Sequence, residues 1–207
     1  MTALLVVVGG VCVLLFAEYY EKSSIKAVAK PLASAAFIAI ALQADAAHSA
    51  YGRWVLGALA LCWAGDVLLI PQGSGKAFLA GLGAFLLGHV AFAGGFLWLG
   101  IEGQIFGAAS LGLVGAAVAI SRWLLPHVRP SMKAPVVAYV VAISIMVTAS
   151  IAASAHTGRW DLAVGATLFL CSDLAVARER FVKAAFTNKL WGLPLYYAAQ
   201  VVLANSV

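Results

Sequence analysis

The segment Cys62–His89 reads CWAGDVLLIPQGSGKAFLAGLGAFLLGH and contains two apolar runs joined by a short turn rich in Pro, Gly and Ser. Asp66 lies within the first run, His89 lies within the second, and Lys76 is the only charged residue between them. A carboxylate in hydrocarbon is expensive, so it is rarely present there without a partner or a task. Asp173 lies in a similar apolar run, LFLCSDLAVA. The pattern predicts a membrane scaffold that holds two carboxylates close to one depth.

The composition is that of a membrane protein. The chain has 207 residues, of which 64% are hydrophobic and 10% charged, and its mean hydropathy is +1.00. A soluble domain is about 45–50% apolar and about 25% charged. The net charge of +5 does not indicate nucleic-acid binding, because the basic residues fall at the ends of apolar segments. The three cysteines all lie inside apolar runs without metal-ligand spacing, which favours inert thiols.

Eight segments meet the requirement of about 20 mainly apolar residues for a membrane-spanning helix. Their expected bounds are 3–20, 26–43, 52–70, 77–100, 104–124, 134–154, 160–178 and 188–205. The first segment lacks a basic n-region, and no small-residue cleavage site precedes Glu18, so we expect a retained helix and not a signal peptide. The expected fold class is therefore all-α: one integral membrane domain, residues 1–207, forming a polytopic bundle of eight transmembrane helices.

The distribution of basic residues predicts the orientation in the membrane. If the eight helices are correct, eleven Lys and Arg residues fall on the side of the odd-numbered loops, and only Arg53 and Arg159 fall on the other side. The eleven are Lys22, Lys26, Lys30, Lys76, Arg122, Arg129, Lys133, Arg178, Arg180, Lys183 and Lys189. Cytosolic loops carry an excess of basic residues, so we expect the odd loops in the cytosol and both termini outside.

The same count gives approximate depths. Asp66 and Asp173 follow the outer arginines of their spans by thirteen and fourteen residues. At 1.5 Å per residue both lie ~20 Å below the outer surface, in the cytosolic half of the bilayer. His89 follows Lys76 by thirteen residues, so the count places it nearer the outer half unless its helix is tilted.

A weak internal similarity relates the two halves of the chain. LALCWAGDVLL and ATLFLCSDLAV align with Asp66 on Asp173, an offset of 107 residues. At nearly that offset His89 falls near Tyr196 and Tyr197. Helices one to four and five to eight would then form two parallel repeats about an axis along the membrane normal.

Asp66 and Asp173 are the candidate catalytic residues. Two carboxyl groups in different apolar environments are able to differ in protonation, so that one donates a proton while the other remains ionised. The alternative is a structural role, with each aspartate neutral or hydrogen-bonded to Ser172, Trp63 or a lysine at a helix end.

Several polar residues share helix faces and are candidates for substrate binding. The candidates are Lys30, His89, Ser172, Tyr196, Tyr197 and Gln200. Lys30 is at the cytosolic mouth, where it is able to pair with a carboxylate or a lipid phosphate. For each candidate a structural role stays open: snorkelling for the lysine, an aromatic belt for the tyrosines, and interhelical contacts for the histidine and the glutamine.

The sequence carries no common catalytic or cofactor motif. It has no phosphate-binding Gly-rich loop, no GxSxG elbow and no HExxH. The other three histidines, His48, His127 and His156, lie in loops or at helix ends, so a three-histidine zinc site within the membrane is excluded. A site of one histidine and two aspartates remains formally possible. We expect no cofactor and no metal.

The motifs KAVAKPL, GDVLL, FLAGLGAFLLGH, GATLFLCSDLAVARERF and YYAAQ, in this order and spacing, resemble the bacterial YhhN proteins and their animal relatives, the lysoplasmalogenases. The resemblance covers the chain from the second to the eighth helix. It implies a multi-pass protein of the bacterial cytoplasmic membrane. The implied substrate is a lysophospholipid, and the implied surroundings are membrane lipid. The implied activity is hydrolysis of the vinyl ether bond of lysoplasmalogens to a fatty aldehyde and a glycerophospho-base.

The resemblance also extends to individual residues. The acidic motif positions correspond to Asp66 and Asp173, and Lys30, His89 and the Tyr196–Gln200 group match recurring polar positions. Ala29 stands where many members have a threonine before the Lys-Pro pair. A vinyl ether is cleaved by protonation of its β-carbon followed by addition of water, which needs a proton donor and a carboxylate. The sequence leaves open which aspartate plays which part.

Two other functions remain open at this point. A proton-coupled transporter of a small solute or a lipid would also use intramembrane acids and repeated halves. Against it, the sequence has no clearly broken helix and the chain is small, although a homodimer would compensate. A non-catalytic scaffold would tolerate replacement of both aspartates.

Overall fold

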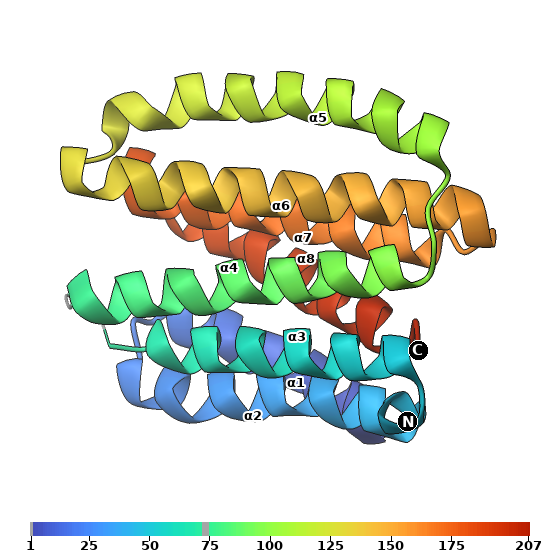
Figure 1. The fold of residues 1–207 in the computed structure, drawn as a ribbon. Coiled ribbons are helices and arrows are strands. Elements are labelled where there is room, and N and C mark those ends of the chain that lie inside the picture. The colour runs from blue at the N-terminus through green and yellow to red at the C-terminus, as the bar shows by residue number, and fades with distance from the viewer. Residues whose placement is uncertain (1, 72–74) are drawn as a thin grey trace.

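The computed structural model describes residues 2–71 and 75–207, and every regular element within them is helical (Figure 1). The Gln-Gly-Ser part of the turn in the Cys62–His89 segment lies outside the described residues. The long helices are α1 (Thr2–Tyr19), α2 (Ser23–Gln43), α3 (Ala50–Leu68), α4 (Gly75–Trp98), α5 (Gly103–Leu124), α6 (Pro130–Thr157), α7 (Asp161–Ala177) and α8 (Phe186–Ala204). Three short elements, η1 (Ala46–His48), η2 (Leu125–His127) and the π-helix η3 (Arg178–Val182), join or extend them.

The eight expected segments are all helices, and their ends differ from the expected bounds by a few residues. Five of them are long and apolar enough to cross a membrane: α1, α2, α4, α5 with η2, and α6. The other three, α3, α7 and α8, are shorter or more polar; α7 has only 17 residues. These three helices carry both aspartates and the Tyr196–Gln200 group.

The helices pack in the order in which the chain produces them. In the first half α1 packs on α2, α2 on α3 and α3 on α4; in the second half α5 packs on α6, α6 on α7 and α7 on α8. The halves meet where α4 packs on α6 and α8 packs on α2 and α1. Figure 1 shows α5 at one edge of the bundle and α1 and α2 at the opposite edge.

The hairpins α3–α4 and α7–α8 are tight because glycines let the helices approach closely. A Cβ atom on Gly65 would lie 2.6 Å from the Phe85 ring, and one on Gly192 would lie 2.6 Å from the Cβ of Ala175. The hydrophobic effect does not drive helices together within lipid, so membrane helices gain dispersion energy by packing closely, which small residues at the contact allow. These two hairpins hold Asp66 and Asp173.

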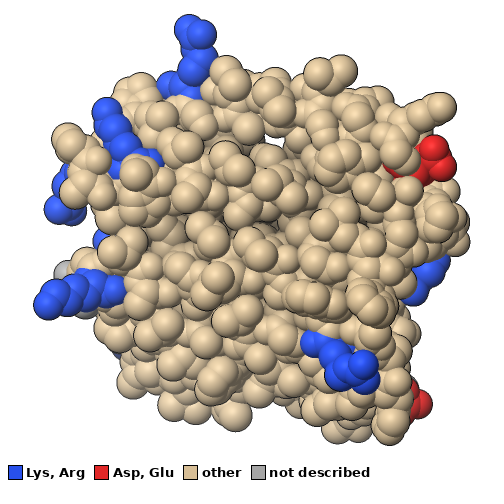
Figure 2. Space-filling model, in the orientation of Figure 1, with Lys and Arg blue, Asp and Glu red and all other residues tan. Residues whose placement is uncertain are grey.

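The charges are asymmetric along the bundle. On the face shown in Figure 2, Lys and Arg side chains gather mainly at the end where α4 begins. Both chain termini lie at the opposite end (Figure 1). This arrangement agrees with the basic side expected from the odd-numbered loops.

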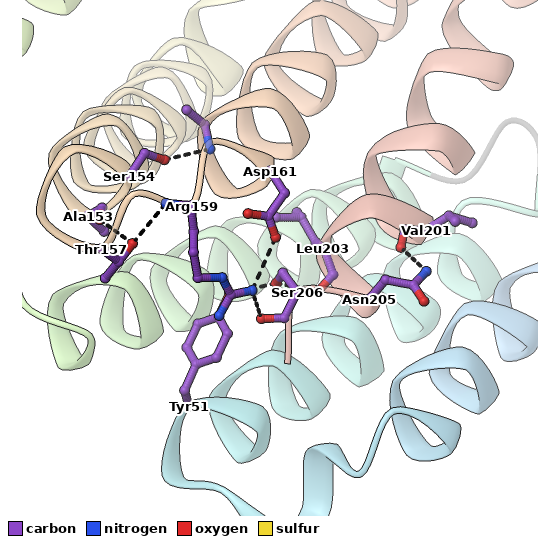
Figure 3. Close-up of polar contacts among 11 residues, drawn as sticks. Tyr51, Ala153, Ser154, Thr157, Arg159, Asp161, Val201, Leu203, Asn205 and Ser206 are labelled. Atoms are coloured by element: carbon purple, nitrogen blue, oxygen red, sulfur yellow. Dashed lines mark hydrogen bonds and ion pairs between the residues drawn. The ribbon is translucent and has the colours of Figure 1, made fainter.

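At the opposite end, Arg159 joins three parts of the chain (Figure 3). Its Nη2 atom donates to the backbone carbonyl of Ser206 and to Asp161 Oδ2, the latter at 3.1 Å. Its guanidinium lies over the ring of Tyr51, 5.9 Å from the centroid, and the Tyr51 hydroxyl is 2.7 Å from Ser206 Oγ. One of the two arginines on this side therefore fastens the end of α8 to α3 and to the start of α7.

Candidate functional site

A cavity of about 250 Å³ lies between the two halves of the bundle, and both Asp66 and Asp173 line it. Its volume is near the lower end of the range of small-molecule sites, about 300–1,000 Å³. Its walls are mostly apolar and include Leu82, Phe85 and Ile143. The two acids that the sequence singled out therefore border one apolar hollow.

Asp66 is buried, and both of its carboxylate oxygens have polar partners. It is 2% exposed, and its Oδ2 atom accepts hydrogen bonds of 2.6 Å from Ser34 Oγ and 2.6 Å from the Tyr196 hydroxyl. Its Oδ1 atom is 3.1 Å from Lys30 Nζ. A buried carboxylate needs such a set of donors, and the adjacent ammonium stabilises its negative charge. Of the structural partners considered for Asp66, the helix-end lysine is the correct one.

The two other proposed partners bond elsewhere. The Trp63 indole donates to the Pro31 carbonyl at 3.2 Å, and Ser172 Oγ donates to the Phe169 carbonyl at 2.9 Å. Both interactions satisfy backbone oxygens within the apolar interior. Ser34, in contrast, was not a candidate, although its spacing of one helical turn from Lys30 places it on the same face of α2.

Asp173 has a different environment. Its Oδ2 atom accepts a hydrogen bond of 2.8 Å from the Tyr139 hydroxyl, and the same oxygen is 3.5 Å from His89 Nε2. Its side chain is 16% exposed, compared with 3% for Asp66. No Lys or Arg forms an ion pair with Asp173 within the described part of the chain, so the two aspartates differ in that only Asp66 has a permanent cation beside it.

Each aspartate is contacted by both halves of the bundle. Asp66 on α3 accepts from Ser34 on α2 and from Tyr196 on α8. Asp173 on α7 accepts from Tyr139 on α6 and lies against His89 on α4. In both cases one partner comes from the second helix of the aspartate's own half, and the other comes from the fourth helix of the other half. The sequence missed Tyr139, whose only signal was a hydroxyl in the middle of an apolar span.

The sequence placed His89 nearer the outer half, unless α4 is tilted, and Asp173 in the cytosolic half. The two side chains lie at one level. The residue count for His89 started at Lys76, the charge expected on the cytosolic side of α4. Because α4 has 24 residues and α7 only 17, equal counts along the two helices do not give equal depths.

The six candidate binding residues divide into two groups. Lys30, Ser172 and Tyr196 line the cavity. The other three, His89, Tyr197 and Gln200, are at most 1% exposed and are not among the described residues that line it.

These three lie behind the carboxylates. The Tyr197 hydroxyl is 3.0 Å from Ser34 Oγ, and the His89 ring packs against the Phe169 ring with centroids 4.6 Å apart. Within residues 2–71 and 75–207, neither the side-chain amide of Gln200 nor Nδ1 of His89 has a hydrogen-bond partner. Their geometry suits supporting residues more than direct substrate contacts.

The possible metal ligands among the described residues do not form a cluster of three. No three His, Cys, Asp or Glu side chains of the described residues cluster as ligands. The group of one histidine and two aspartates that the sequence left open is therefore not assembled: His89 contacts one aspartate, and Lys30 occupies the space beside the other.

A network of charged residues surrounds the mouth of the cavity. Glu18 Oε2 accepts from Lys26 at 3.2 Å and from Lys189 at 2.7 Å, so Lys26 is paired and does not merely snorkel. Lys189 is also 3.5 Å from Glu179, whose other oxygen accepts from the Asn188 amide. Burial alone would raise the pKa of Glu179, but its hydrogen bonds and Lys189 outweigh that and hold the pKa below its usual range.

Comparison with known proteins gives the family of this chain. The profile of the YhhN family matches residues 25–207. A protein of Mycobacterium bovis named lysoplasmalogenase is 35% identical over an alignment of 184 positions that covers 83% of this chain and 67% of that protein. The pig protein named lysoplasmalogenase TMEM86B is 29% identical over 170 residues, covering 82% of this chain and 70% of its own length. No solved structure matches the chain. The match over most of its length shows that the chain belongs to the YhhN family.

Proposed function

We propose that this chain is a membrane-embedded hydrolase that cleaves the vinyl ether bond of lysoplasmalogen-like lysolipids to a fatty aldehyde and a glycerophospho-base. The observation that carries the proposal is an apolar cavity bordered by two carboxyl groups with different partners. The names of the mycobacterial and pig relatives support the same activity.

In this proposal all eight helices cross the bilayer, with the odd loops in the cytosol. The common end of the two termini and the gathering of Lys and Arg at the other end support an even number of crossings. The helix α7 spans only ~26 Å at 1.5 Å per residue, and the π-helix η3 extends it toward the ~30 Å of the hydrocarbon core.

The two halves form parallel repeats. The packing order is the same in each half, and the partners of Asp66 and Asp173 come from corresponding helices. His89 and Tyr196, one at each aspartate, are 107 residues apart, the offset that also relates the aspartates. An axis along the membrane normal would relate the halves and place the cavity between them.

The environments of the aspartates assign the roles that the sequence left open. Asp66 is the ionised carboxylate, because the Lys30 ammonium and two hydroxyl donors stabilise its charge. Asp173 is the acid, because it lacks a permanent cation and an uncompensated charge is expensive in an apolar wall. Tyr139 and His89 position its carboxyl group.

The reaction then proceeds in three steps. Asp173 protonates the β-carbon of the vinyl ether, which leaves an oxocarbenium ion at the adjacent carbon. Asp66 stabilises this cation and removes a proton from the water that adds to it, giving a hemiacetal. In the last step the C–O bond to glycerol breaks. Protonated Asp66 returns its proton to the glycerol oxygen, and Asp173 takes the proton of the hemiacetal hydroxyl. Both aspartates then have their initial protonation states.

A proton-coupled transporter is the second candidate. The observation that favours it is that each aspartate bridges the two halves, so protonation would alter contacts between them. Uptake of solute or lipid into proteoliposomes without formation of product would favour this alternative.

The test of the hydrolase is incubation of the purified protein with lysoplasmalogen and detection of aldehyde by mass spectrometry. We expect aldehyde from the wild type and its loss in Asp66→Asn and in Asp173→Asn. The matched control is Asp45→Asn, because Asp45 is 87% exposed at the other end of the chain's second helix. Full activity in either cavity variant would remove the mechanism, and no aldehyde from the wild type would remove the function.

A further inference from the structure

Of the described cations that line the cavity, Arg180 is the one without a carboxylate partner. Lys26 and Lys189 pair with Glu18, Lys30 pairs with Asp66, and Arg178 donates to the Asn188 side chain at 2.7 Å. Arg180 lines the same cavity. Its guanidinium has no ion pair within the part of the chain that the structure describes, although four carboxylate residues, Glu18, Asp66, Asp173 and Glu179, line the same cavity.

An aromatic pair holds the Arg180 guanidinium in place. The guanidinium carbon lies 4.2 Å from the centroid of the Phe78 ring, a cation–π distance. The Phe78 ring packs against Phe181 with centroids 6.0 Å apart, and both rings line the cavity. An arginine stacked on a ring loses less freedom when it binds an anion, and its planar fork suits the oxygens of a phosphate.

The position of Arg180 relative to the catalytic acid also indicates a ligand. Arg180 follows Asp173 by seven residues along α7 and η3, and both residues line the cavity. The rise over seven residues is ~10 Å. In a lysoplasmalogen the reacting vinyl ether and the phosphate are separated by the glycerol backbone alone, a spacing of the same order.

We propose that Arg180 binds the phosphate of the lysolipid head group and thereby sets the vinyl ether at the level of Asp173. This inference rests on the proposed function and names the part of the substrate that the site recognises. The hydrocarbon chain then lies along the apolar wall of Leu82, Ile120 and Val140. The phosphate takes the place beside Phe78, at the cytosolic mouth.

The first experiment compares two substrates that differ only in the phosphate-containing head group: a lysoplasmalogen and the alkenylglycerol that lacks it. For each variant, the kcat/KM value for the lysoplasmalogen is divided by the value for the alkenylglycerol. In Arg180→Gln we expect this ratio to fall about tenfold or more, mainly because the KM for the lysoplasmalogen rises. Arg180→Lys should recover part of the loss. Arg122→Gln is the matched control, because Arg122 is also a basic residue near the end of a helix but does not line this cavity. An unchanged ratio in Arg180→Gln would contradict the proposal.

A second experiment separates this inference from the proposed reaction. Binding of a saturated 1-alkyl lysophospholipid, which has no vinyl bond, is measured by titration in detergent micelles. We expect Arg180→Gln to weaken binding about tenfold relative to Arg122→Gln, even if no aldehyde is ever formed. Equal affinity in the two variants would overturn the inference. Displacement of the lipid analogue by inorganic phosphate at equal concentration would also overturn it, because the site would then bind free phosphate.

Discussion

The side chains beside the two aspartates decide the chemistry that each can perform. Asp66 has three donors, one of them charged, whereas Asp173 has a tyrosine hydroxyl and a histidine at 3.5 Å. The sequence identified the acids, because a charge within an apolar run is a conspicuous pattern. It did not distinguish them, because the partners come from helices far apart in the chain.

The ion pair of Lys30 and Asp66 leads to a prediction about stability. Lys30→Met leaves a buried carboxylate without its cation, so we expect a loss of about 3 kcal/mol in the free energy of unfolding. Adding Asp66→Asn should recover most of that loss, since the uncompensated charge is then gone. Lys26→Met should cost less, because Glu18 keeps Lys189 at 2.7 Å. Denaturation of the single and double variants in detergent measures the coupling; additive losses in the double variant would contradict it.

The helix is the scale at which sequence patterns were most informative. All eight helices were predicted within a few residues, because about 20 apolar residues between polar turns define a helix without reference to its neighbours. Depth was less predictable. The residue counts placed His89 and Asp173 at different depths although their side chains are in contact, because the helices differ in length and length fixes depth only when the ends are known. The repeats and the crossing of all eight helices stay predictions.

The close packing of α3 on α4 leads to a second prediction, argued from Gly65. Gly65→Ala would bring a Cβ atom to 2.6 Å from the Phe85 ring. Phe85 lines the cavity and packs on Tyr196 with centroids 5.9 Å apart, so its displacement should lower both stability, by about 1–3 kcal/mol, and activity.

The control for this variant lies on the same helix. Nothing lies within 4 Å of a Cβ atom on Gly57, so Gly57→Ala should be neutral or slightly stabilising. Melting temperature and aldehyde formation are measured for both variants. Equal behaviour of the two would show that the hairpin does not depend on this contact.

At the scale of the whole molecule, the bundle separates a basic end from an end that carries both termini and the Arg159 cluster. The cavity opens among charged residues of the basic end, namely Glu18, Lys189 and Arg180. If that end is cytosolic, the substrate enters with its head group toward the cytosol and its chain toward the inner leaflet.

The orientation of the whole molecule is testable with reporters fused to the C-terminus. We expect a periplasmic reporter such as alkaline phosphatase to be active and a cytosolic fluorescent reporter to be dark, because eleven of thirteen basic residues lie on the opposite side. The reverse result would move the cavity to the outer half of the membrane and would contradict the assigned depths.

The central claim is that two carboxyl groups on one cavity divide the work of an acid and a base. Hydrolysis of lysoplasmalogen in D₂O, with immediate trapping of the aldehyde and mass spectrometry, tests it most directly. Proton transfer from Asp173 to the β-carbon predicts one deuterium on the carbon next to the aldehyde group, and no such product in Asp173→Asn. An aldehyde without that deuterium, or the labelled aldehyde formed by Asp173→Asn at the rate of the wild type, would contradict the account.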